Sequence, residues 1–141
     1  MEERFSSEDR GVAAASCQDM KRILVAEDRP ASLELIRTIL ESAGYQVIEA
    51  ADGQEALEKA SRNAIDLVLL DLQMPKLDGF GVLKQLRSDS SFRHTPILAL
   101  TASAMESDRD RALAAGFSGY ITKPVDIRFL RSEMERLLKI S

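Results

Sequence analysis

Residues 67–71 read LVLLD, a run of four branched apolar side chains followed at once by a carboxylate. An uninterrupted apolar run of this length is typical of a strand that is buried on both faces of a parallel sheet. Two other stretches have the same form, ILVAED at residues 23–28 and ILALT at residues 97–101. These three runs predict the central strands of a covered sheet, each ending in a polar residue.

Between these runs the apolar residues recur at helical spacing. Leu33, Ile36 and Leu40 mark a first helix that Gly44 ends, and the last helix carries Ile127, Leu130, Met134, Leu137 and Leu138, which we expect to be buried. The expected strands are 23–26, 45–50, 67–70, 97–100 and 120–122, each followed by a helix. Five strand–helix units in strict alternation predict an α/β fold with a doubly wound parallel sheet. The strand order 2-1-3-4-5 of flavodoxin-like folds fits, because it places the more polar second and fifth strands at the edges.

Composition excludes several classes of protein. The chain has 141 residues, net charge −4 and a single cysteine, so it has neither an internal disulfide nor a multi-cysteine zinc site. No apolar run approaches the roughly 20 residues that span a bilayer, and the polar N-terminus is unlike a secretory signal. No basic cluster of the kind that binds nucleic acid is present. We expect a cytoplasmic protein that binds neither membrane nor nucleic acid, with a flexible leader at residues 1–20 and one domain at residues 21–141.

The polar residues that follow the strands converge in this topology. In such sheets, ligands bind beyond the carboxyl ends of the strands. The first strand runs into Glu27 and Asp28, the third into Asp71, the fourth into Thr101 and the fifth into Lys123. We therefore expect three carboxylates, a hydroxyl and an ammonium group on one rim.

This set of groups suggests phosphoryl chemistry. Three carboxylates in one cleft repel one another, and Mg²⁺ relieves the repulsion because it prefers oxygen ligands. Asp71 is a candidate nucleophile, since aspartyl phosphates are a known covalent strategy. The metal and Lys123 would neutralise charge on the transferring oxygens.

At these residues the sequence resembles the receiver domain of two-component response regulators. The motifs are Glu27-Asp28, the run from Asp71 to Pro75 with Asp78-Gly79, Thr101-Ala102 and Lys123-Pro124. Each motif is short, but their order and spacing together are specific to the family. The resemblance covers Lys21 to about Lys139. Because no output domain follows Leu138 in the sequence, we expect a stand-alone receiver or one excised from a longer protein.

The resemblance implies a role for each acidic residue. Asp71 would accept a phosphoryl group from a histidine kinase or a histidine phosphotransfer protein. Asp28, Asp71 and the backbone carbonyl of Gln73 would ligate Mg²⁺, and Glu27 would act through a metal-bound water. Lys123 would contact Asp71 and later the phosphoryl group.

The resemblance also implies a switch. Thr101 would hydrogen-bond a phosphoryl oxygen, and Tyr120 would turn inward as Thr101 moves. The Lys123–Pro124 peptide bond would be cis. The surface of the fourth helix, fifth strand and fifth helix would bind a downstream protein and is a candidate dimer interface.

The period of the last helix gives a separate expectation. Phe129 points away from the stripe of Leu130, Met134 and Leu137, so we expect its ring to be exposed and to join this surface beside Tyr120.

Other functions fit the residues less well. A Mg²⁺-dependent phosphatase of the haloacid dehalogenase type would have a second aspartate where Gln73 stands, and a flavodoxin-like electron carrier would have a phosphate loop where Glu27 and Asp28 stand. A receiver fold that serves only as an interaction module, without phosphorylation, is the remaining alternative. For a receiver domain we expect no enzyme activity beyond the protein's own phosphorylation and dephosphorylation.

Overall fold

The computed structural model describes residues 21–74, 77–102 and 106–138, so the leader expected at residues 1–20 lies outside the described residues. Strands and helices alternate along the chain. The strands are β1 (Arg22–Ala26), β2 (Gln46–Ala50), β3 (Leu67–Asp71), β4 (Ile97–Thr101) and β5 (Gly119–Thr122). The helices are α2 (Pro30–Ser42), α3 (Gly53–Arg62), α4 (Gly79–Arg87), α5 (Glu106–Ala115) and α6 (Ile127–Leu138), with a short 3₁₀ turn, η2 (Ser90–Phe92).

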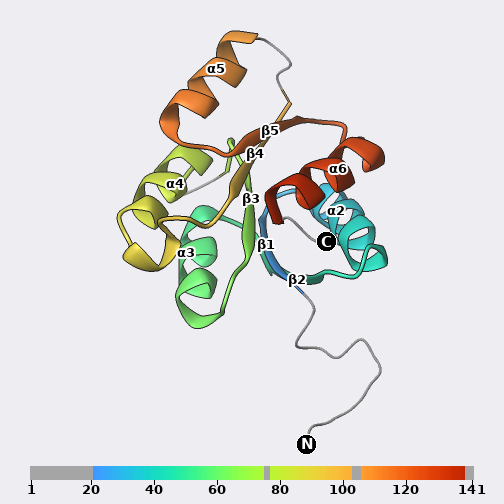
Figure 1. Ribbon diagram of the computed structural model, residues 1–141, viewed down its shortest axis with the longest axis horizontal. Helices are drawn as coiled ribbons and strands as arrows, with labels where there is room; N and C mark the ends of the chain where they lie inside the picture. The colour runs from blue at the N-terminus through green and yellow to red at the C-terminus, as the bar shows by residue number, and fades with distance from the viewer. Residues whose placement is uncertain (1–20, 75–76, 103–105, 139–141) are drawn as a thin grey trace, which may run out of the picture.

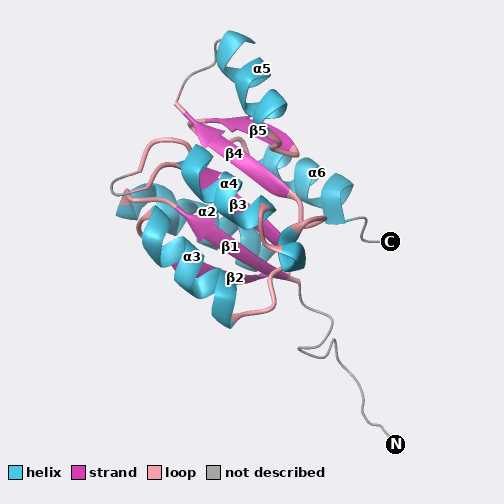
Figure 2. Cartoon of the chain, turned by 90° about the vertical axis from the view of Figure 1, so that its left-hand side faces the viewer, coloured by secondary structure: helices cyan, strands magenta, loops and turns pink. Residues whose placement is uncertain are grey.

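The five strands form one parallel sheet in the order β2-β1-β3-β4-β5, which confirms the predicted topology. Helices α2 and α6 cover one face, and α3, α4 and α5 cover the other (Figure 1). The side view in Figure 2 shows the strands running side by side between these two layers. Ligand-binding residues at the carboxyl ends of the strands therefore share one edge of the sheet.

Strand β3 shows why the central runs are apolar throughout. All five of its residues are buried. Leu67 and Leu69 belong to the core beneath α2 and α6, whereas Val68 and Leu70 belong to the core beneath α3 and α4. Because successive side chains point to opposite faces, a strand covered on both sides needs apolar residues at every position.

Glycines shape two helix ends. Gly44 has φ +96° and follows α2, as the sequence predicts, because a residue with a Cβ rarely adopts this conformation. At Gly79, the first residue of α4, a Cβ would lie 2.6 Å from the carbonyl oxygen of Asp71. Glycine therefore lets α4 begin directly against the end of β3.

Helix α5 is held less firmly than the others. Among its residues with described side chains, only Ala112 is buried. The turn after α5 is fastened by Arg87, whose guanidinium donates to the carbonyl oxygens of Phe92 and Thr95 at 2.7 Å and of Gly116 at 3.3 Å. Burial lowers the pKa of Arg87. This arginine therefore ties the end of α4 to the loop before β4 and to the loop before β5.

One expectation for α6 is wrong. Leu130 and Met134 are buried, and Leu137 and Leu138 pack against the same core, but Ile127 is 52% exposed. Ile127 is the first residue of the helix, ahead of the turn that packs on the sheet. Phe129 is 46% exposed, as the helical period predicts.

Within the described part of the chain, no helix combines the length and the apolar character that a membrane span requires.

Candidate functional site

The structure brings the predicted polar residues to one rim. Glu27 and Asp28 directly follow β1, and Asp71 and Thr101 end β3 and β4. Lys123 follows β5, where its backbone N–H donates to the carbonyl oxygen of Thr101 at 2.7 Å. Because the strands are parallel, all five residues lie at the same edge of the sheet, as the sequence predicts.

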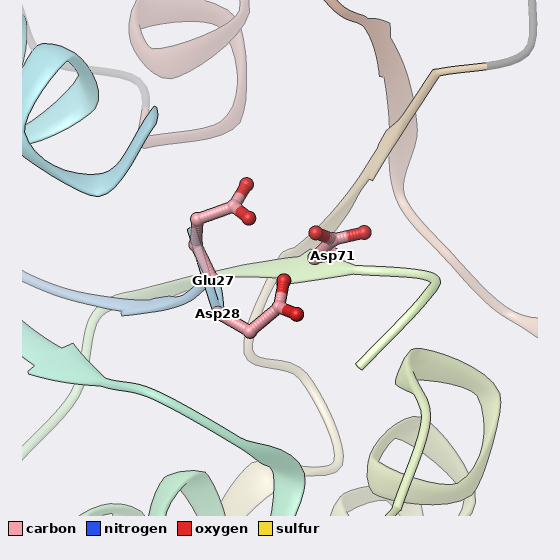
Figure 3. A group of neighbouring side chains, drawn as sticks. All are labelled: Glu27, Asp28 and Asp71. Atoms are coloured by element: carbon pink, nitrogen blue, oxygen red, sulfur yellow. The ribbon is translucent and has the colours of Figure 1, made fainter. Parts of the chain in front are cut away.

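The three carboxylates form a cluster. One oxygen from each of Glu27, Asp28 and Asp71 lies within 4.8 Å of the others. Figure 3 shows the three side chains gathered beyond the ends of β1 and β3. Glu27 and Asp71 are 1% and 4% exposed, whereas Asp28 is open to solvent. Buried like charges this close repel one another and require a compensating cation.

Lys123 supplies part of that compensation. Its Nζ lies 2.5 Å from Glu27 Oε1 and 2.8 Å from Asp71 Oδ2. Burial alone would lower the pKa of Lys123, but the hydrogen bonds to Asp71 and Glu27 outweigh burial and the pKa is raised. The ammonium group therefore stays protonated and is shared between two carboxylates.

Backbone groups complete the placement of the carboxylates. Asp71 Oδ1 accepts a hydrogen bond from the backbone N–H of Gln73 at 2.9 Å, which leaves Oδ2 to Lys123. Glu27 Oε2 accepts one from the backbone N–H of Arg29 at 3.1 Å. The pKa of Glu27 is raised, chiefly because the group is buried, and the nearby Asp71 raises it further.

The donor set fits a hard divalent cation. Within the described residues, Glu27 Oε1 is buried and lacks a hydrogen-bond donor of regular geometry, although Lys123 lies against it. Three carboxylates carry more negative charge than one ammonium offsets. Oxygen ligands from Asp28, Asp71 and the Gln73 backbone match the preference of Mg²⁺, which keeps several waters in proteins.

Thr101 and Tyr120 are in contact. Thr101 is buried, and its side chain hydrogen-bonds the phenol of Tyr120. Burial raises the pKa of Tyr120, and the charge of Asp108 raises it further. The Lys123–Pro124 peptide bond, directly after β5, is cis, as the resemblance implies.

Two cavities meet at Gln73. The first, of about 220 Å³, is lined by Asp28, Arg29, Asp71, Gln73, Ala102 and Lys123. The second, of about 240 Å³, includes Gln73, Thr101, Phe80 and Arg111 in its wall. The guanidinium of Arg111 lies 4.5 Å from the centre of the Phe80 ring and so fastens α5 to α4.

Sequence reasoning missed Arg29 as a residue of the site. The sequence does contain a signal for Arg29, which is an unusual residue type at its position. Arg29 stands directly between the acidic pair and Pro30, the first residue of α2. A position before a helical proline usually holds Ser, Thr, Asp or Asn.

A doubly wound sheet with this acidic rim is the architecture of two-component signalling proteins. The chain belongs to the response regulator receiver domain family, whose sequence model matches residues 23–135.

Named relatives agree with this assignment. The chain is 37% identical over 113 residues to the polar-differentiation response regulator DivK of Brucella anthropi, covering 79% of this chain and 92% of DivK. Among solved structures, the chemotaxis response regulator CheY4 of Vibrio cholerae aligns with a TM-score of 0.80 and 34% identity, over 84% of this chain and 99% of CheY4. The receiver domain of the sensor histidine kinase PA1611 of Pseudomonas aeruginosa aligns with a TM-score of 0.79 and 36% identity, over 86% of this chain and 99% of that domain. That structure is described as holding a magnesium ion in its active-site cleft.

Proposed function

We propose that this receiver domain accepts a phosphoryl group on Asp71 from a phosphohistidine of a histidine kinase or a histidine phosphotransfer protein. The observation that carries the proposal is the placement of the Asp71 carboxylate. It ends a buried strand, faces an open cavity, and stands between a lysine and two further carboxylates.

The chain's own residues prepare the nucleophile. The hydrogen bond from Gln73 N–H and the ion pair with Lys123 fix the orientation of the Asp71 carboxylate. An oxygen of Asp71 attacks phosphorus, the bond from phosphorus to the histidine nitrogen breaks, and that nitrogen keeps the electron pair. Lys123 is already charged and within reach, so it can follow the oxygens of the transferred group.

Asp28, Asp71 and the Gln73 carbonyl would hold Mg²⁺, with Glu27 acting through a water. When bound, Mg²⁺ supplies positive charge that offsets the charge on the phosphoryl oxygens. The reaction modifies the protein itself, which agrees with a signalling domain rather than a metabolic enzyme.

Labelling with acetyl phosphate and Mg²⁺ tests the acceptor. Intact-mass analysis should show one added phosphoryl group on the wild type and none on Asp71→Asn. Asp110→Asn, at an exposed position of α5, is the matched control and should be labelled like the wild type. Equal labelling of Asp71→Asn would identify another acceptor. No labelling of any variant would favour a receiver fold that serves only as an interaction module.

We further propose that phosphorylation changes the surface formed by α5, β5 and α6, where a downstream protein or a second copy of the chain binds. The hydroxyl of Thr101, now bonded to Tyr120, would move to a phosphoryl oxygen and leave the Tyr120 phenol to change its position. Phe129 adds exposed apolar area on α6.

Beryllofluoride with Mg²⁺, a stand-in for the phosphoryl group, should shift the amide resonances of Tyr120 and of α5. Thr101→Ala should bind beryllofluoride but lose the shift at Tyr120. Resonance changes confined to the acidic rim would contradict the proposed switch.

A further inference from the structure

Arg29 breaks the pattern by which the helices of this protein begin. Asp52, Asp78 and Asp89 precede α3, α4 and η2, and each accepts a hydrogen bond from the helix backbone with its side chain. Arg29 precedes α2 and makes no such bond. A cation at this end of a helix is also disfavoured by the helix dipole. Local stability therefore does not account for an arginine at this position.

The surroundings of Arg29 place it at the acidic rim. Its backbone N–H is bound to Glu27, and the residue lines the same cavity as Asp71 and Lys123. Arg29 is exposed, and its guanidinium forms no hydrogen bond or ion pair with the described part of the chain. Arg37 and Arg136, by contrast, are paired with Glu49 and Glu133. Arg29 thus brings an uncommitted positive charge to the cavity that contains Asp71.

The charge balance of the rim shows what effect this arginine has. Lys123 is already engaged by Glu27 and Asp71, so its charge is compensated before any donor arrives. Three carboxylates, one ammonium and one divalent cation leave the rim with no net charge. Arg29 makes that balance positive, which favours the approach of an anion and opposes the binding of a cation.

We propose that Arg29 is an anion-steering residue that attracts the negatively charged phosphoryl group of the donor to Asp71. This inference rests on the proposed function of Asp71 as the acceptor. It assigns to Arg29 two effects of opposite sign: faster capture of a phosphoryl anion and weaker binding of Mg²⁺. A residue that only stabilised the start of α2 would not produce this combination.

Arg29→Gln tests the proposal, with Arg62→Gln as the matched control. Arg62 is an exposed arginine at the last position of α3, so its replacement changes the net charge equally without touching the rim. The phosphorylation rate is measured with acetyl phosphate at subsaturating concentration and saturating Mg²⁺, over a series of NaCl concentrations. Mg²⁺ affinity is measured separately by calorimetry.

Arg29→Gln should react about two- to fivefold more slowly at low salt, the range expected for one charge acting on a dianion across about 8–10 Å of solvent. Its rate should also depend less on salt, and its Mg²⁺ affinity should rise by a similar factor. Arg29→Lys should restore the wild-type behaviour, because the charge is retained.

Equal rates and salt dependences for Arg29→Gln and Arg62→Gln would overturn the role of Arg29. A loss of Mg²⁺ affinity in Arg29→Gln would also overturn it, since that result would mean a structural effect on the rim. A wild-type protein that is not labelled at all would overturn the proposed function and this inference together, whereas the first two results leave the function of Asp71 intact.

Discussion

Replacing Lys123 by Met should destabilise the metal-free protein by about 3 kcal/mol. The substitution keeps the aliphatic volume but removes the ammonium group that Glu27 and Asp71 share. Removing one partner of a buried ion pair costs about 3–5 kcal/mol, because a buried charge is left uncompensated. The lower end applies, since the Lys123 side chain is 16% exposed and water can reach part of the site. Urea unfolding in EDTA, followed by circular dichroism, measures this loss.

Two further measurements show whether charge is the cause. The double variant Glu27→Gln with Lys123→Met should recover part of the lost stability, because one of the two stranded carboxylates is gone. Saturating Mg²⁺ should narrow the difference between Lys123→Met and the wild type, since a cation bound at the rim replaces the missing charge and stabilises the folded state. A loss below about 1 kcal/mol for Lys123→Met, or an additional loss on adding Glu27→Gln, would refute this reasoning.

Three other expectations concern individual interactions in the structure. Burial raises the folded-state pKa of Glu27 above 4.5. In EDTA, the stability of the wild type relative to Glu27→Gln should therefore be highest at low pH and should decline as the pH rises from 4.5 through the folded-state pKa. A relative stability that increases over this pH range would contradict the prediction. Arg87→Met should cost about 2 kcal/mol in urea unfolding, because partly buried carbonyls lose a charged donor, while labelling at Asp71 stays unchanged. A double-mutant cycle with Phe80→Leu and Arg111→Met should give a coupling energy of about 0.5–1 kcal/mol, and additive effects would show that the cation–π contact is inert.

The fold could be predicted from the sequence because its central strands are buried on both faces. A continuous run such as residues 67–71 has few alternatives when helical stripes lie on either side of it. The polar character of the second and fifth strands then placed them at the sheet edges, where the structure has β2 and β5. Ile127 was misjudged because helical periodicity gives the direction of a side chain but not whether the sheet extends beneath it.

The membership of the acidic rim was also predictable, since the end of each parallel strand is fixed by topology. The pairing within the rim was not. Sequence order does not show that Lys123 bridges Glu27 and Asp71, or that Glu27 is buried while its neighbour Asp28 is exposed. Those facts depend on the side-chain directions at the ends of β1 and β5, which the order of residues does not specify.

These pairings bear on how the site could act as a switch. In the metal-free protein, Lys123 is attracted by two buried carboxylates, and the surplus negative charge at the rim opposes the approach of another anion. A divalent cation would change this balance, because Asp71 would gain a second positive partner beside Lys123, and Lys123 would then be less strongly retained. Phosphorylation of Asp71 would add negative charge at the end of β3, and Thr101 ends the neighbouring strand β4. Since Thr101 already contacts Tyr120, a change of charge at one carboxylate has a direct route to the outer surface through a single hydroxyl group.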